Sequence, residues 1–226
     1  MTTYSKPQFL VTSFLVLVLV DNIFIQSGAS VKFTDVIQTS GIQFTHEDGK
    51  SYKKYFTETL GSGVALLDYD NDNDLDIYFV NGSSLDNSKT VRAYNHLYRN
   101  DGNLTFTDVT MESQTGNQGC GTGVCVGDYN NDGWLDMYVT NFRSNVLYRN
   151  NKDGTFTDVT ETANVDCQKW STGCSFSDVD GDGDLDLYVA NYVDFSIERH
   201  IPCRVNGILA YCSPRVYDGL KDVFFR

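Results

Sequence analysis

Short segments in which hydrophobic and polar residues alternate are the most regular feature of this chain. In one of them Leu75, Ile77 and Phe79 occupy every second position, and in a later one Leu187 and Val189 do the same. A period of two places successive side chains on opposite faces, which is the geometry of a β-strand and not of a helix. The pattern therefore predicts a chain built from β-strands.

These strands belong to units that recur along the chain. The segments DYDNDNDLDIYFVN, DYNNDGWLDMYVTN and DVDGDGDLDLYVAN begin at Asp68, Asp128 and Asp178, at intervals of 60 and 50 residues. A second module recurs between them, as LYRNDGNLTFTDVT from Leu97 and LYRNNKDGTFTDVT from Leu147. Repeats of this length predict an array of similar supersecondary units rather than one large sheet.

Each unit has the signals of four antiparallel strands. Asp101-Gly102 and Asp153-Gly154 separate two aromatic-rich runs, and Asp-Gly between such runs is typical of a β-hairpin. Four strands in about 50 residues describe a β-propeller blade. We therefore predict an all-β fold with repeats at about 61–109, 121–159 and 173–226, the last incomplete. Because closed propellers need about four to eight blades, about three blades would make an incomplete ring and a fragment of a longer protein.

Glycines precede the first strand of each unit, as in Gly61-Ser62-Gly63 and Gly121-Thr122-Gly123. A glycine has no Cβ, so another backbone can approach it closely. We expect tight backbone packing at these positions.

The aspartate clusters have the spacing of a metal-binding loop. Side-chain oxygens at positions one, three, five and nine of a tight turn converge on one point, and the carbonyl at position seven adds another ligand. Position six needs a positive φ, which Gly133 and Gly183 allow and Asn73 tolerates. The predicted ligands of the three loops are Asp68, Asp70, Asp72, Asp74 and Asp76; Asp128, Asn130, Asp132, Trp134 and Asp136; and Asp178, Asp180, Asp182, Asp184 and Asp186. Such an oxygen-rich set predicts Ca²⁺ as the bound ion.

Two other interpretations of the loops are weaker. An EF-hand needs a glutamate at position twelve and flanking helices, whereas Phe79, Val139 and Val189 stand there between β-patterned segments. A solvated acidic turn would leave carboxylates repelling one another in three separate copies. The loop that begins at Asp128 has only three carboxylates where the others have five, so we expect its site to be the weakest.

The overall charge agrees with a cation-binding protein. The formal net charge is −13 at pH 7, a surface that repels nucleic acid and anionic lipid and suits cations or basic partners. His46, His96 and His200 are scattered and share no motif. We expect no catalytic residues, since the calcium loops account for the carboxylates that a glycosidase pair would otherwise use.

The N-terminus has the features of an export signal. Lys6 precedes an apolar run from Phe9 to Val20, and Ser27 and Ala29 fit a small-x-small cleavage site. We predict a signal peptide at residues 1–29 and a mature segment at 30–226, secreted or extracellular, or periplasmic or at the cell surface in a bacterium. The alternative is an uncleaved anchor, which would attach the chain to a membrane.

Six cysteines follow the predicted signal, an even number that suggests disulfides in an exported protein. Fifteen pairings are possible. The sequence-local scheme is Cys120–Cys125, Cys167–Cys174 and Cys203–Cys212, of which the last is favoured because the turn residues Asn206-Gly207 lie between its members. The chain has no CxxC motif and no histidine beside a cysteine pair, which argues against zinc.

The units resemble FG-GAP repeats, also called VCBS repeats, as found in the integrin α propeller. The LYRN…DGTFTDVT module and the stretch CRVNGILAYCSPRVYDGLKDVFFR are similar to the cartilage acidic protein and ASPIC/UnbV group of secreted proteins. The resemblance extends over about Phe33 to Arg226. It implies an aspartate loop that binds calcium within a hairpin of each blade.

The same resemblance implies a secreted module for extracellular binding or adhesion, with a protein or glycan ligand. The alternative is an accessory propeller of a secreted polysaccharide-active enzyme. A catalytic domain beyond Arg226 would favour that alternative.

Overall fold

The computed structural model describes residues 31–85 and 93–226, and Asp35–Arg226 form one compact unit. The predicted signal peptide and its cleavage site lie outside the described residues. Within the described part of the chain, no helix is long and apolar enough to cross a membrane.

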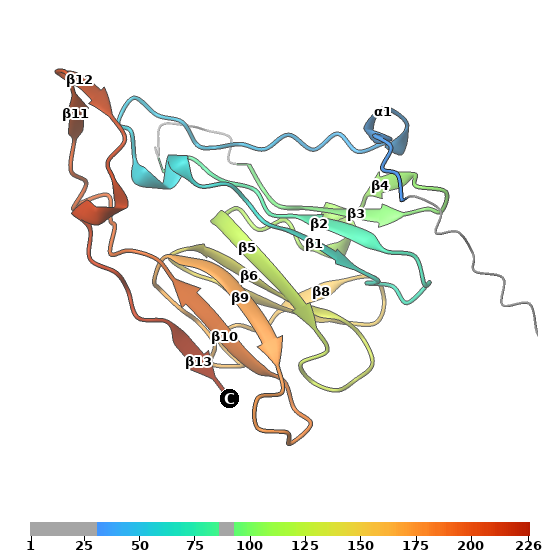
Figure 1. Ribbon diagram of the computed structural model, residues 1–226. Helices are drawn as coiled ribbons and strands as arrows, with labels where there is room; N and C mark the ends of the chain where they lie inside the picture. The colour runs from blue at the N-terminus through green and yellow to red at the C-terminus, as the bar shows by residue number, and fades with distance from the viewer. Residues whose placement is uncertain (1–30, 86–92) are drawn as a thin grey trace, which may run out of the picture. The chain divides into compact units, whose positions relative to one another are not determined.

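The described residues form short antiparallel sheets, as the alternating pattern predicts (Figure 1). Two sheets have four strands, in the orders β1-β2-β3-β4 and β5-β6-β7-β8, and a third has the order β13-β10-β9. We call these the first, second and third blade. Their strands are β1 (Val64–Leu67), β2 (Asp76–Phe79), β3 (His96–Asn100), β4 (Phe106–Asp108), β5 (Cys120–Gly127), β6 (Asp136–Phe142), β7 (Val146–Asn150), β8 (Phe156–Asp158), β9 (Ser171–Ser177), β10 (Asp186–Asn191) and β13 (Val223–Phe225).

The first two strands of every blade pair in the same register. Across the three hairpins the equivalent partners are Leu67 with Asp76, Gly127 with Asp136, and Ser177 with Asp186. Strand β13 pairs with β10 as β3 pairs with β2, so it is the LYRN-type strand of the third unit. The propeller-type, all-β architecture is confirmed, and the described blades form no closed ring.

Short helices and one hairpin lie outside the blades: α1 (Ile37–Ser40), η1 (Phe56–Thr59), α2 (Thr110–Ser113), η2 (Pro214–Val216), and the hairpin of β11 (Cys203–Val205) with β12 (Ile208–Ala210). This hairpin projects away from the sheets in Figure 1. Its turn residues Asn206 and Gly207 have φ angles of 52° and 82°, as a tight turn of this kind requires. The predicted Cys203–Cys212 disulfide closes the hairpin, with an S–S distance of 2.06 Å.

The other two predicted disulfides are wrong. Cys120 and Cys125 lie in the same extended strand, β5, where five residues span roughly 16 Å and the Cα atoms of a disulfide are at most about 7 Å apart. Cys167 lies before strand β9, and its thiol donates to Asn191 Oδ1 at 3.7 Å. Cys174 lies within strand β9. These four cysteines are thiols in the structure.

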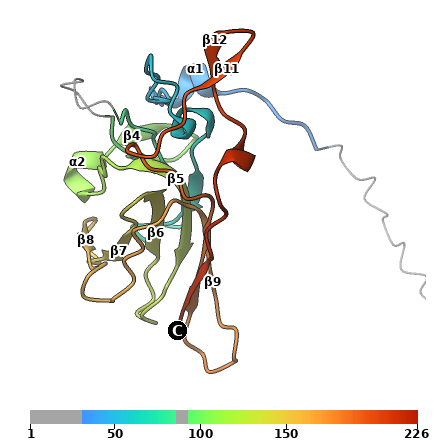
Figure 2. The same cartoon turned by 90° about the vertical axis from the view of Figure 1, so that its left-hand side faces the viewer.

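The apolar core lies between the faces of successive blades. Strand β6 is buried at every residue, because the second blade is covered on both faces. In β2 only alternate residues are buried, and Tyr188 of β10 is 44% exposed although its equivalents Tyr78 and Tyr138 are fully buried. Figure 2 shows β6, β7 and β8 of the covered blade side by side. Each outer blade thus buries the face that it turns to the second blade.

The same buried polar contacts recur in the first two blades. The hydroxyl of Tyr78 donates to Thr115 O at 2.9 Å and accepts a hydrogen bond from Asn95 Nδ2 at 3.0 Å. In the second blade Tyr138 and Asn145 interact in the same way, at 3.1 Å. A buried hydroxyl needs such partners, so these tyrosines serve packing within the blades.

The first strands of successive blades approach closely at the predicted glycines. A Cβ atom on Gly63 would lie 2.8 Å from Gly123 Cα, and one on Gly123 would lie 3.2 Å from Thr172 O. The equivalent Gly173 of the third blade has no atom within 4 Å of such a Cβ. Glycine is therefore required where one blade backbone meets the next.

We expect Gly63→Ala to destabilise the protein by about 1–3 kcal/mol, because the methyl group must push apart two backbones. Gly173→Ala is the matched control at the equivalent position and should change stability by no more than about 1 kcal/mol, in either direction. Urea unfolding of both variants measures the two values. Equal effects at the two positions would contradict the close approach.

Candidate metal centres

Each aspartate loop connects the first two strands of a blade. We call residues 68–76, 128–136 and 178–186 the first, second and third loop, and number their positions from one to nine. Each loop is short because the strands that it joins are antiparallel neighbours. All fifteen predicted ligands therefore lie in equivalent places, one set at the end of each hairpin.

The aspartate at position one shapes the loop by accepting backbone hydrogen bonds. Asp128 Oδ1 accepts from Asp132 N at 2.9 Å, and its Oδ2 accepts from Gly133 N at 2.7 Å. Asp68 and Asp178 make the same contacts in their loops, at 3.0–3.2 Å. Position six has positive φ throughout, with 70° at Asn73, 87° at Gly133 and 94° at Gly183, so that prediction is confirmed.

The aspartate at position nine is buried and joins the loop to the blade. Asp76 Oδ2 accepts from Tyr69 N at 3.0 Å, and its Oδ1 accepts from Asn100 N at 2.8 Å. Asp136 has the equivalent contacts in the second blade, and burial raises the pKa of both carboxyl groups to about 6. Asp186 accepts from Val179 N at 3.0 Å. The residue at position nine therefore has a structural role in addition to its predicted role as a ligand.

The carboxylate at position five of each loop accepts a hydrogen bond from the backbone of its own loop. Asp72 Oδ1 accepts from Asp74 N at 2.8 Å, and Asp132 Oδ1 accepts from Trp134 N at 3.0 Å. Asp182 accepts from the Asp184 backbone in the same way, at 3.0 Å. These bonds fix the peptide units that lead into position seven, whose carbonyls are the predicted backbone ligands.

The carboxylates converge in the first and third loops. One carboxylate oxygen each of Asp68, Asp70 and Asp76 lie within 4.8 Å of one another, as do those of Asp178, Asp180 and Asp182. Asp70 Oδ1 is buried and has no hydrogen-bond partner among the described residues. The pKa of Asp70 is raised, mainly by burial and secondly by the negative charge of the neighbouring Asp72. A cation at this point would supply the missing interaction.

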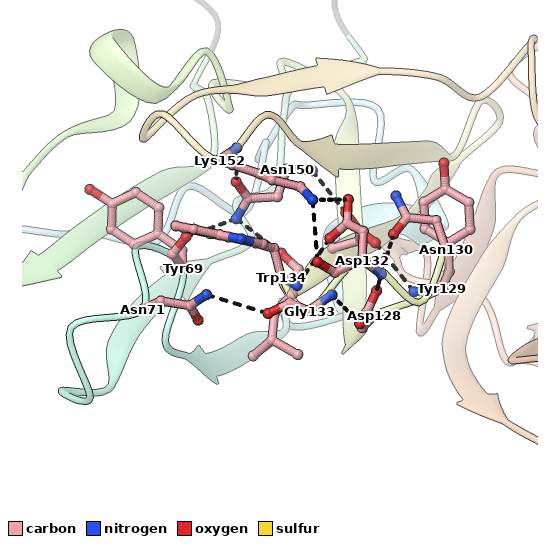
Figure 3. A network of polar contacts seen from close by, with 12 residues as sticks. Tyr69, Asn71, Asp128, Tyr129, Asn130, Asp132, Gly133, Trp134, Asn150 and Lys152 are labelled. Atoms are coloured by element: carbon pink, nitrogen blue, oxygen red, sulfur yellow. Dashed lines mark hydrogen bonds and ion pairs between the residues drawn. The ribbon is translucent and has the colours of Figure 1, made fainter. Parts of the chain in front are cut away.

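The second loop differs because a lysine lies against it. Lys152 Nζ lies 3.3 Å from Asp132 Oδ2 and donates to Asp132 O at 3.2 Å (Figure 3). The side chain of Asn130 is exposed, and no three carboxylates of this loop come together among the described residues. In the third loop, Arg226 forms an ion pair with Asp180. In the second and third loops, a positively charged side chain of the protein therefore neutralises part of the carboxylate charge.

Asparagines connect neighbouring loops, a feature that the sequence pattern alone does not reveal. Asn71 Nδ2 donates to Gly133 O at 3.3 Å (Figure 3). In the same way, Asn131 Nδ2 donates to Gly183 O at 3.2 Å. Asn150 Nδ2 crosses from the second blade to the first and donates to Tyr69 O at 2.8 Å. Asparagine at position four of two consecutive loops is the only signal of the first two contacts.

The three histidines lie apart, each with its own partner. His46 contacts Ser62 Oγ, His96 contacts Asp108, and the remaining histidine contacts the backbone of Lys53. These are contacts of the kind that hold loops and strands in place.

A family model described as an FG-GAP-like repeat matches the chain twice, over residues 68–139 and 128–189. Together the two matches cover all three loops and more than half of the chain. Comparison with curated proteins gave no match. The closer relation to the ASPIC/UnbV group stays a prediction.

The structural role of the position-nine aspartate can be separated from its predicted role as a metal ligand by measuring stability in metal-free protein. Asp76→Ala leaves the N–H groups of Tyr69 and Asn100 without acceptors inside the blade, so we expect a loss of about 2–4 kcal/mol in stability. Asp72→Ala, in the exposed part of the same loop, should cost less than about 1 kcal/mol. Denaturant unfolding in excess chelator measures both. A similar loss in the two variants would show that position nine has no special structural role.

Proposed function

The chain belongs to the FG-GAP-like repeat family, and we propose that it is a calcium-binding module of β-propeller blades that binds a protein or glycan ligand outside the cell. The single observation that carries the calcium assignment is the unpartnered, buried Asp70 Oδ1 beside the carboxylates of Asp68 and Asp76. The donors are all oxygens, which favours a hard cation over zinc or copper.

Calcium fits the form of the loops better than magnesium does. Their carboxylates and carbonyls lie on a short turn at the end of a hairpin, and Ca²⁺ accepts six to eight oxygens in variable geometry. Mg²⁺ demands a near-ideal octahedron and keeps several waters. Calcium would link the carboxylates of a loop and remove their mutual repulsion, and so hold the hairpin rigid.

Three features support a location outside the cytosol. The Cys203–Cys212 disulfide is of a kind that persists in oxidising compartments, and FG-GAP repeats are typical of extracellular proteins. The segment at residues 1–29 has the composition of an export signal. We propose secretion, or a periplasmic or surface location if the protein is bacterial.

The proposed role is binding and not catalysis. With a net charge of −13, the surface favours basic or cation-bridged ligands and disfavours nucleic acid. The aspartates of the loops are committed to backbone contacts and to the proposed ion, and we assign them no acid–base role.

Calcium should stabilise the folded protein. At a free concentration about 100 times Kd, binding adds about 2.7 kcal/mol per site, which for a chain of this size raises Tm by roughly 5–10 °C. Thermal unfolding with calcium, with magnesium and with chelator measures the shift. Asp70→Asn should reduce it, while Glu112→Gln, which removes a charge outside the loops, should not. Identical melting in chelator and in calcium, on protein shown to be metal-free, would disprove the proposal.

We expect the second loop to have the lowest calcium affinity of the three, partly because the positive charge of Lys152 lies against its carboxylates. Lys152→Met should raise the calcium affinity of this loop about fivefold, since a unit charge at such a distance in water is worth ~1 kcal/mol. Lys53→Met, outside the loops, is the control. Terbium luminescence sensitised by Trp134 reports on the second loop. A second loop that fills first, or an unchanged affinity in Lys152→Met, would contradict the electrostatic ranking.

A further inference from the structure

Three of the four thiols lie on the first strands of the second and third blades, and two of these three pack into the apolar layer between the blades. Cys125 is in β5 of the second blade and Cys174 is in β9 of the third. The two strands are held together by Thr122 Oγ1, which donates to Ser171 O at 2.6 Å, and by the close approach at Gly123.

The repeat explains why these two side chains face each other. Aligned on the loops, Cys125 is equivalent to Ala65 of the first blade, and Cys174 is equivalent to Val124 of the second. Ala65 and Val124 pack into the apolar layer between the first and second blades. Cys125 and Cys174 pack into the layer between the second and third blades. At the second interface two cysteines therefore replace the alanine–valine pair of the first.

The local contacts agree with this placement. Cys174 Sγ donates to Tyr138 O at 3.3 Å, and Tyr138 is the cross-strand neighbour of Cys125. The pKa of the Cys174 thiol is raised, mainly by its contact with the side chain of Cys125 and secondly by burial. The other two thiols have different surroundings: Cys120 is half-buried near the backbone of Ser83, and Cys167 interacts with Ser171 and Asn191.

We propose that Cys125 and Cys174 form a disulfide that links the second and third blades covalently. The two thiols lose two protons and two electrons as their S–S bond forms. The oxidant is a disulfide, either glutathione disulfide or a protein disulfide carrier, whose own S–S bond breaks to give two thiols. The link would join neighbouring blades where Gly123 already brings their backbones together, and it would hold them whether or not the loops carry calcium.

Disulfide mapping of the full chain tests the pairing directly. The protein is refolded in a mixture of reduced and oxidised glutathione, free thiols are alkylated without reduction, and the peptides are analysed by mass spectrometry. We expect a peptide pair joined through Cys125 and Cys174 beside the one joined through Cys203 and Cys212. Alkylation of both Cys125 and Cys174, or a link from either to another cysteine, would overturn the proposal.

A double variant measures what the link contributes. Cys125→Ala with Cys174→Val recreates the alanine–valine pair of the first interface, so apolar packing is retained. Under oxidising conditions its Tm should fall below that of the unaltered protein by roughly 10 °C, because the link closes a long loop. The difference should disappear in reductant, which opens Cys203–Cys212 in both proteins alike. The control pair Cys120→Ala with Cys167→Ala should keep the link. A Tm difference of the same size in both conditions would assign the effect to packing and refute the disulfide.

Discussion

Apolar contact between the faces of successive sheets is the interaction on which the rest of this structure depends. Tyr78 and Val80 of the first blade meet Met137 and Val139 of the second, and all four are completely buried. Full burial of each such side chain contributes about 1.5–3 kcal/mol, more than the roughly 0.5–1.5 kcal/mol that a single hydrogen bond contributes. A blade of this size cannot bury both faces by itself, so its stability comes from its neighbours.

That packing also positions the aspartate loops. Asp76 and Asp136 lie where the blade ends and the loop begins, and each accepts one N–H from the loop and one from the third strand. Burial raises the pKa of both to about 6, which is the electrostatic cost of placing a carboxylate inside the blade edge. In the first and third loops three carboxylates then come together at the end of the hairpin, where a cation can reach them.

Equivalent loops in one chain are not equivalent electrostatically. The first loop leaves Asp70 with an unpartnered oxygen, the second has Lys152 against Asp132, and the third has Arg226 against Asp180. Asn71 and Asn131 connect each loop to the next, so a change in one loop has a direct path to its neighbour. A repeated motif thus gives loops of different local charge within one module.

The sequence alone determined those features that depend on neighbouring residues. Strand periodicity, the hairpin turns, the positive φ at Asn73 and Gly133, and the Cys203–Cys212 link all follow from local geometry. Tertiary structure decided what depends on which faces meet. The sequence-local pairing of Cys125 with Cys120 is wrong because both lie in one extended strand, and Cys125 instead faces the next blade. The contact of Lys152 with Asp132 likewise joins two different turns of the second blade, and only the pairing of its strands brings these turns together.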